Sequence, residues 1–216
     1  MMKLYGTEFS IMVNKVRFVA HYLDMPYEFA RVNLFSGENR TEAYLKIHPA
    51  GKVPAIDDDG FCLFESNAII RYLAEKKVSP IYPRDLKERA LVDMWMDFVS
   101  LHVGTAMGRV FYNRVIAKFL ESRVDENSLS EGLKFLEKFL PVIDQELGGN
   151  EFVAGDKITL ADFNLLAQLD PAEISQVDLG PYSNIVIWRK KLMKEEFYVK
   201  CYASYTDLVM QMQQKK

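Results

Sequence analysis

The sequence predicts a two-part fold, an α/β domain followed by an all-helical domain, and three observations carry that prediction. Strand-like and helix-like patterns alternate over the first third of the chain, whereas only helical periodicity follows. Pro80 and Pro83 interrupt the chain between the two regions, and paired prolines disfavour a continuous helix. We therefore expect domains over residues 1–78 and 87–216, joined by a linker over residues 79–86.

Length, composition and charge bound the class of protein. The chain has 216 residues, of which 49% are hydrophobic and 26% are charged, as in ordinary globular domains. Its 27 Lys and Arg against 30 Asp and Glu give a formal net charge of −3, which argues against a nucleic-acid partner. The first residues carry no signal-peptide pattern, and the longest uncharged run, 98–108, is shorter than the ~20 residues that span a bilayer. With only two cysteines, Cys62 and Cys201, a reducing compartment is the simpler interpretation, and together these observations predict a cytoplasmic protein with no membrane partner.

The first domain alternates strand and helix signals. Val16, Val19, Ala20 and Leu23 stand at i, i+3, i+4 and i+7, which predicts one apolar face of a helix. The Asp-Asp-Asp-Gly turn at 57–60 separates two short apolar runs and predicts a hairpin. In order, we expect a strand over 3–6, a helix over 11–23, a strand over 28–33, a short helix over 40–47, strands over 53–56 and 61–64, and a helix from Ser66.

The order of these elements predicts how the strands pair. A crossover helix between the first two strands implies parallel pairing, and the hairpin adds an antiparallel edge. This is the order of a thioredoxin-like domain. The second domain shows only helical stripes, and one helix begins with Thr-Leu-Ala-Asp at 159–162, a capping box with Asp in place of Glu. Its two clearest stripes are Leu91, Met94, Trp95, Phe98 and His102, then Leu133, Leu136, Phe139, Leu140 and Ile143.

Two positions join a predicted strand to a predicted helix and place polar side chains beside free helix N–H groups. Ser10 precedes the helix over 11–23, and Glu65 and Ser66 open the last helix of the domain. Serine hydroxyls and first-turn N–H groups can bind an anion there, while Glu65 can receive an ammonium group. Each serine is also consistent with an ordinary N-cap, and Glu65 with a solvated acid.

Pro54 lies between two apolar residues, Val53 and Ala55, of a predicted strand. Proline cannot donate a hydrogen bond to a strand ladder, so it belongs at an edge or a bulge. A cis bond before Pro54 would turn the backbone of Val53 outward and offer its N–H and C=O to a peptide-like ligand. A trans edge proline is the simpler alternative, because the trans form is favoured by about 0.5–1 kcal/mol.

Together these segments resemble the cytosolic glutathione transferases of the serine type, most closely the phi and theta classes. Residues 3–16 are similar to the family's first strand, catalytic serine and first helix. Residues 49–55, Pro-Ala-Gly-Lys-Val-Pro-Ala, are similar to its N-P-x-G-x-V-P-A segment, with His48 in place of Asn. Residues 63–69 are similar to its L-x-E-S-x-A-I segment, and 155–162 to the capping motif of its helical domain. The resemblance extends over nearly the whole chain.

The resemblance implies a site for glutathione as co-substrate, and it implies no metal. Ser10 would donate to the glutathione sulfur, and Val53 would pair its backbone with the cysteinyl unit beside a cis Pro54. Glu65 and Ser66 would bind the ammonium and carboxylate of the γ-glutamyl end. The residues implied near the glycyl carboxylate are Asn39, where phi enzymes often have His, together with Arg40 and Lys52.

The resemblance also implies an electrophile site between the two domains. A methionine-containing apolar lining favours flat or hydrophobic electrophiles. The residues predicted to face this site are Ile11, Met12, Phe35, Met107, Phe111 and Val115. The last three are also consistent with ordinary core. Tyr5 is predicted to pack in its strand beneath the site, and Cys62 to be an inert thiol in a core strand.

The leading functional hypothesis is an enzyme that adds the glutathione thiolate to an electrophilic carbon in detoxification, with peroxidase or dehalogenase chemistry as possible side activities. The alternative is a non-catalytic protein of the same fold that acts in protein–protein interaction, like the stringent-starvation or translation-factor relatives. Such relatives often lose the thiol-activating residue or the cations, whereas Ser10, Arg40 and Lys52 are present here. The family further implies a homodimer, and Phe61 and Phe64 are candidates for its contact.

Overall fold

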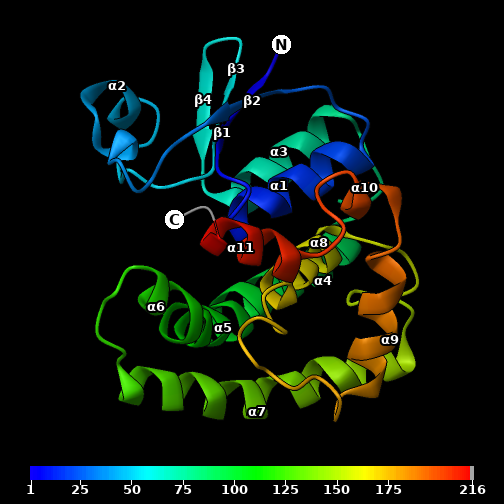
Figure 1. Cartoon of the computed structure of the whole chain (residues 1–216). Coiled ribbons are helices and arrows are strands. Elements are labelled where there is room, and N and C mark those ends of the chain that lie inside the picture. Colours follow the sequence, from blue (N-terminus) through cyan, green and yellow to red (C-terminus); the bar gives the residue numbers. More distant parts are fainter. Residues whose placement is uncertain (215–216) are drawn as a thin grey trace.

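The computed structural model describes residues 1–214 and consists of a small sheet with its helices and a larger group of helices below it (Figure 1). The first part comprises β1 Lys3–Gly6, α1 Ile11–Tyr22, β2 Glu28–Arg31, η1 Glu38–Arg40, α2 Glu42–Leu45, β3 Ala55–Asp58, β4 Phe61–Phe64 and α3 Ser66–Lys76. The second comprises α4 Leu86–Phe98, η2 Val99–Gly104, α5 Thr105–Phe111, η3 Tyr112–Ile116, α6 Ala117–Phe119, α7 Glu126–Gly149, α8 Leu160–Leu169, α9 Ser183–Leu192, α10 Glu196–Val199 and α11 Tyr205–Gln214. The predicted fold class is confirmed.

The sheet has the strand order β2-β1-β3-β4, with β1 and β2 parallel and the other two pairs antiparallel. This is the pairing that the element order predicts. Helices α1 and α3 lie between the sheet and the helical domain (Figure 1). Gly6 allows α1 to pack closely against β1, because a Cβ at that position would lie 2.5 Å from the Val13 side chain of α1.

Some element boundaries differ from the prediction, and the reasons are local. β3 begins at Ala55 rather than 53, because Pro54 has no N–H to donate to the ladder. The short helix predicted over 40–47 is divided into η1 and α2, with Thr41 as N-cap of α2. The prediction that Cys62 lies in the core is wrong. The residue is exposed, because β4 is the outer strand of the sheet.

A long helical path runs through α4, η2, α5, η3 and α6, and α7 packs along α5. Its segments η2 and η3 are π-helical, a local widening that is frequent near functional sites. Leu91 and Met94 of the predicted stripe stay exposed on α4, whereas Trp95 is buried. Within residues 1–214, no helix is both long enough and apolar enough to cross a membrane.

Helix α8 is the centre of the helical domain, and every one of its residues is buried. Its start is the predicted capping box, with Asp162 as the returning acid. The Asp162 carboxylate accepts from the N–H groups of Val153 at 2.9 Å and Thr159 at 2.8 Å, and from Trp188 Nε1 at 3.0 Å. Burial raises the pKa of Asp162 to about 6, so these donors face a carboxylate at neutral pH.

We expect Asp162→Ala to lower the free energy of unfolding at pH 7 by at least about 3 kcal/mol, because it leaves three buried N–H donors without an acceptor and each costs about 1–3 kcal/mol. Urea unfolding measures this. The matched control is Asp156→Ala, which removes an exposed acid from the same loop. A loss below about 1 kcal/mol for Asp162→Ala would contradict the structural role given to this residue.

Candidate active site

The register of the sheet brings three chain segments to one edge. Tyr5 pairs with Ala55 across β1 and β3, and Ala55 pairs with Phe64 across β3 and β4. Since both pairings are antiparallel, the end of β1, the start of β3 and the end of β4 meet there. The loop to Ser10, the turn through Pro54 and the start of α3 therefore lie close to one another.

Ser10 is the N-cap of α1, and its backbone is extended at φ −91° and ψ 115°. Its hydroxyl oxygen accepts from Val13 N at 3.4 Å. It donates to no protein acceptor in the described part of the chain, and the side chain is partly exposed. The hydroxyl hydrogen is thus free to meet an incoming anion beside the first turn of α1.

Two hydrogen bonds, one local and one from a distant helix, hold the loop before Ser10. Asn14 Nδ2 of α1 donates to the carbonyl of Glu8 at 2.6 Å. The Tyr205 hydroxyl of α11 donates to the carbonyl of Phe9 at 2.7 Å. The loop is therefore fixed on one side by the helix that it opens and on the other side by the last helix of the described chain.

The turn before β3 contains a cis Val53–Pro54 bond, as the resemblance implies. Asn39 Nδ2 donates to the carbonyl of Gly51 at 2.6 Å, and the Tyr44 hydroxyl donates to the carbonyl of Lys52 at 2.7 Å. Burial raises the pKa of Tyr44 to about 12, which keeps its hydroxyl a donor. Asn39 thus acts in this structure by holding the turn.

The start of α3 places Glu65 and Ser66 at the end of β4. Glu65 is exposed and has φ +69°, a sparsely populated conformation for a non-glycine residue that clusters at ligand sites. Ser66 is buried and donates its hydroxyl to Met12 Sδ at 3.6 Å. Arg40 and Lys52 are exposed, and neither shares an ion pair with another side chain of residues 1–214.

The residues predicted to face an electrophile do not all gather in one place. Ile11, Phe111 and Val115 form one apolar cluster with α11. The Phe35 ring contacts the Phe119 ring at 4.9 Å and is 58% exposed. Met107 is fully buried in the main core, so it lines no open surface in this conformation.

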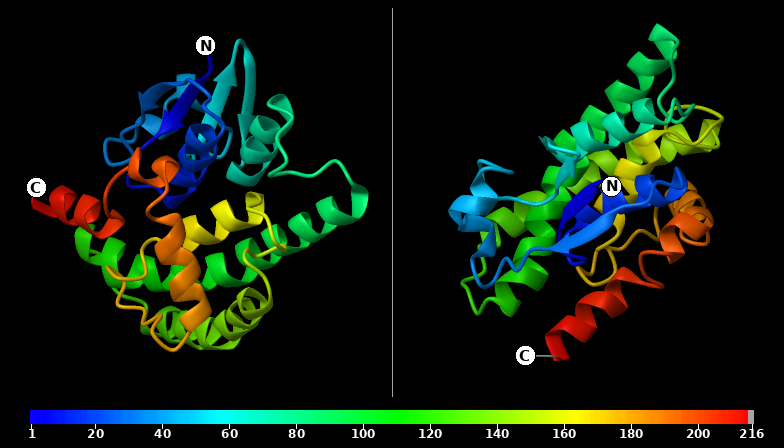
Figure 2. Two further views of the ribbon diagram at one scale, coloured as in Figure 1. Left: turned by 90° about the vertical axis from the view of Figure 1, so that its right-hand side faces the viewer. Right: turned by 90° about the horizontal axis from the view of Figure 1, so that it is seen from above.

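Sequence reasoning missed the part that α11 plays here. Tyr205 and Val209 are buried against Val115, and Figure 2 shows α11 alongside the green helices α5 and α6. The apolar residues Tyr205, Leu208 and Val209 stand at i, i+3 and i+4, and this helical pattern was the signal available in the sequence.

Sequence reasoning also missed Lys15, which is 1% exposed. Its Nζ donates to Asn67 Oδ1 at 2.5 Å and to Asn164 Oδ1 at 2.9 Å. Burial lowers the pKa of Lys15 to about 7, and the nearby Arg71 charge acts in the same direction. The resemblance contains Lys15 in its first motif, but only the structure shows that its amino group joins two other helices.

The fold and the site together define a class of two-domain proteins that bind a peptide-like thiol. In this class a thioredoxin-like sheet is joined to a helical domain, and its edge carries a hydroxyl at a helix N-terminus, a cis-proline turn and an acid–serine pair. Family models agree: the glutathione S-transferase N-terminal domain matches residues 1–75, and the C-terminal domain matches residues 103–196.

Individual relatives support the same assignment. The chain is 35% identical over 167 residues to glutathione S-transferase F13 of Arabidopsis thaliana, covering 76% of each, and 31% identical to glutathione S-transferase 1 of Zea mays, covering 76% of this chain and 77% of that one. The structure matches glutathione transferase F2 from Populus trichocarpa with a TM-score of 0.87 and 27% identity over 100% of both chains. It matches glutathione S-transferase-I bound to lactoylglutathione with a TM-score of 0.86 and 29% identity, covering 94% and 98%. The chain belongs to the glutathione S-transferase family.

We expect the stability of this protein to rise with pH above neutrality because of Lys15. Between the folded pKa of about 7 and the ordinary value of 10.5, the unfolded chain holds a proton that the native chain has released, so the free energy of unfolding increases with pH. Relative to Lys15→Met, the unsubstituted protein should gain about 2–3 kcal/mol between about pH 7 and about pH 9.5 in urea unfolding.

All other titrating groups are common to the two proteins, so their contributions cancel in this difference. Parallel pH profiles for the two proteins would show that Lys15 keeps its ordinary pKa in the fold.

Proposed function

We propose that this family member is a catalytically active glutathione transferase, in which the Ser10 hydroxyl stabilises the glutathione thiolate for attack on a small hydrophobic electrophile. The observation that carries the proposal is the position of Ser10, at the N-terminus of α1 and at the sheet edge where the other two implied segments converge. Relatives named as glutathione transferases, one of them bound to a glutathione conjugate, support the same activity.

The magnitudes agree with this role for Ser10. A free thiol has a pKa near 8.5, and lowering it by roughly two units requires about 2.7 kcal/mol in favour of the thiolate. A charge-assisted hydrogen bond contributes about 1.5–3 kcal/mol, and a helix N-terminus about 0.3–1 kcal/mol. The Ser10 hydroxyl and the N-terminus of α1 can therefore lower the thiol pKa by this amount without a general base, and the hydroxyl itself does not need to ionise.

The remaining glutathione contacts follow from the charges at the site. Glu65 would receive the γ-glutamyl ammonium, and the first turn of α3, beginning with Ser66, would receive the carboxylate. The turn at Val53 offers backbone groups to the cysteinyl unit. Arg40 and Lys52 are exposed cations for the glycyl carboxylate. Asn39 contributes through its hydrogen bond to the carbonyl of Gly51, which holds the turn that carries Lys52.

The reaction is a substitution or an addition at an electrophilic carbon. The thiolate supplies the electron pair for the new C–S bond, and with chlorodinitrobenzene chloride departs with the electrons of the broken C–Cl bond. Ile11 and Phe111 are partly exposed apolar neighbours of Ser10 and α11, and they would receive the hydrophobic part of the electrophile. Met12 lies beside Ser66 at the same edge.

We expect Ser10→Ala to lower kcat for chlorodinitrobenzene at neutral pH by about 10- to 100-fold, because a charge-assisted hydrogen bond of about 1.5–3 kcal/mol to the thiolate is lost. The Kd for glutathione, measured by calorimetry, should change much less. Initial rates of conjugation and retention on immobilised glutathione check both expectations.

Asp85→Ala is the control for this variant, since Asp85 is the N-cap of α4 and its loss removes a cap at another helix. Unchanged turnover in Ser10→Ala would exclude the proposed role of the hydroxyl. If the unsubstituted protein fails to bind glutathione at millimolar concentration, the protein–protein interaction alternative replaces the enzyme.

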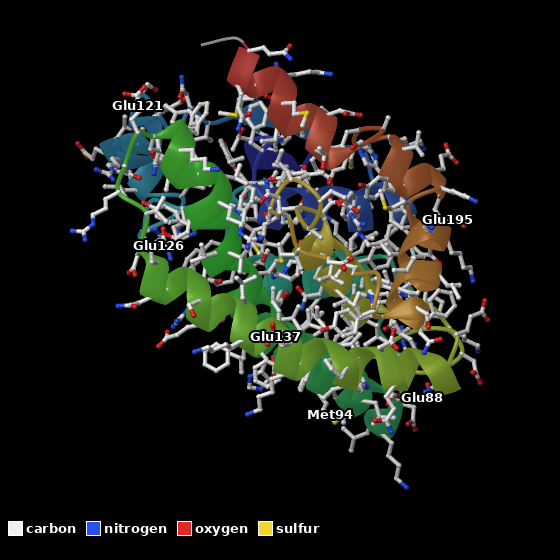
Figure 3. The ribbon with its side chains drawn as sticks, turned by 60° about the horizontal axis from the view of Figure 1, so that its bottom comes forward. Glu88, Met94, Glu121, Glu126, Glu137 and Glu195 are labelled. Atoms are coloured by element: carbon white, nitrogen blue, oxygen red, sulfur yellow. The ribbon has the colours of Figure 1, made fainter. Side chains whose placement is uncertain are left out.

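We further propose that the protein forms a homodimer through exposed apolar side chains. Phe61 on β4 is 50% exposed, and Leu91 and Met94 on α4 are 49% and 51% exposed. Met94 lies at the periphery of the helical domain (Figure 3). A dimer contact through these side chains would remove exposed apolar area from water.

Met94→Glu is expected to shift the protein from dimer to monomer in sedimentation velocity at micromolar concentration, because the dimer would bury an unpaired carboxylate. Val142→Glu, which replaces a 43% exposed side chain on α7, is the matched control and should remain dimeric. Monomeric unsubstituted protein, or equal effects of the two variants, would refute this surface.

A further inference from the structure

We propose that Lys15 is a positioning residue for glutathione binding, which holds the first turn of α3 in register with the N-terminus of α1 and with the helical domain. The inference rests on the proposed function, because Glu65 and Ser66 at the start of α3 are the residues proposed there to bind the γ-glutamyl end. It adds a residue that lies beneath the site and touches neither reactant.

Lys15 is unusual because its amino group is buried among neutral partners. The side chain is 1% exposed, and its Nζ contacts two amide oxygens, Asn67 Oδ1 and Asn164 Oδ1. In the described part of the chain it forms no ion pair with a carboxylate. A lysine amino group is almost never fully buried without a partner, and two amide oxygens compensate little of the desolvation of a full charge.

The hydrogen bonds around Lys15 close into a ring of four side chains, which we call the Lys15 ring: Lys15, Asn67, Ser100 and Asn164. Both amides use their oxygen for Lys15 and their nitrogen for Ser100 Oγ, at 2.9 Å in each case. Asn164 Nδ2 also donates to the carbonyl of Met96 at 3.0 Å. The ring thus joins α1 and α3 of the first domain to η2 and α8 of the second.

The position of the ring connects it to the glutathione residues. Asn67 directly follows Ser66, so its side chain fixes the first turn of α3, and Lys15 lies in the second turn of the helix that Ser10 caps. A change in this contact would move the two helix N-termini relative to each other. Misplacement of about 1 Å at such a site reduces binding and rate substantially.

The chemistry of the amine agrees with the geometry. A neutral amine has two N–H donors, and Nζ has two acceptors within hydrogen-bond distance. The charged side chains that act on it are Glu65, which favours the ammonium form, and Arg71, which disfavours it and is itself paired with Asp93 at 2.8 Å. The burial that lowers its pKa to about 7 therefore leaves a substantial fraction of the amine uncharged at neutral pH, and that form matches the two acceptors.

The decisive variant is Lys15→Met, which replaces the apolar stem of the side chain by one of equal length and removes the amino group with both hydrogen bonds. We expect KM for glutathione to rise about tenfold while KM for chlorodinitrobenzene stays within about twofold and kcat at saturating glutathione changes less than KM. Asn184→Ala is the matched control, because it removes the two hydrogen bonds that Asn184 Nδ2 donates to Asp144 between α9 and α7, and it should leave KM for glutathione unchanged.

A second variant keeps the proposal testable if Lys15→Met does not fold. Asn164→Ala breaks the Lys15 ring at its member in the helical domain and changes none of the proposed glutathione-binding residues. Because the ring is broken, KM for glutathione should rise several-fold. The double variant with Asn67→Ala should be no worse than the more affected single variant, because both changes break one ring. If Lys15→Met and Asn164→Ala both keep KM for glutathione within twofold of the unsubstituted protein, the positioning role is refuted.

Hydrogen exchange on the ligand-free protein separates this inference from the proposed function. Opening the Lys15 ring should increase exchange of the amides of residues 66–70 more than that of amides in α9. A protein that does not bind glutathione at all would refute the proposed function, and the exchange experiment would still decide the role of Lys15. Unchanged exchange at residues 66–70 in both Lys15→Met and Asn164→Ala would overturn it.

Discussion

The backbone pairing of β3, with β1 on one side and β4 on the other, is the constraint on which the site depends. The pairs Tyr5–Ala55 and Ala55–Phe64 bring the start of α1, the turn at Pro54 and the start of α3 to one sheet edge. A slip of one residue in either pairing would turn every side chain of the shifted strand to the opposite face and move these segments apart. The close contact of Gly6 with α1 and the hydrogen bonds to the carbonyls of Gly51 and Lys52 keep that register in place.

Local patterns were sufficient to predict most of the first domain. Turn residues, the 3.6-residue periodicity and the polar residues between strand and helix identified β1, α1, β4 and the start of α3, and the family motifs identified the polar residues of the candidate site. Properties that depend on distant packing were not accessible. The exposure of Cys62 depends on which strand lies at the edge, and the burial of Met107 depends on how α5 meets the neighbouring helices. Lys15 could be read only as a motif residue, because its partners are 52 and 149 positions away.

Two buried polar groups, Asp162 in the helical domain and Lys15 between the two domains, organise the helices in different ways. Asp162 receives N–H donors from its own loop, from Thr159 and from Trp188, so a short sequence pattern indicates much of its environment. Lys15 has its partners on α3 and α8. Its environment therefore forms only when the two domains are joined, and the sequence around Lys15 does not predict it. Such groups lower stability unless they are fully partnered, and in exchange they favour a single arrangement of the helices over alternatives with the same apolar contacts.

The hydrogen bond from the Tyr205 hydroxyl to the carbonyl of Phe9 spans 196 positions of the chain. During synthesis the first domain leaves the ribosome long before α11 exists, and domains generally fold in the order in which they emerge. The loop that presents Ser10 therefore gains this hydrogen bond only after α11 has been made, although its own residues precede that helix by most of the described chain. A nascent or truncated chain that ends before α11 can complete its sheet and still lack one of the two anchors of that loop, so the final geometry of the loop requires that synthesis has continued through α11.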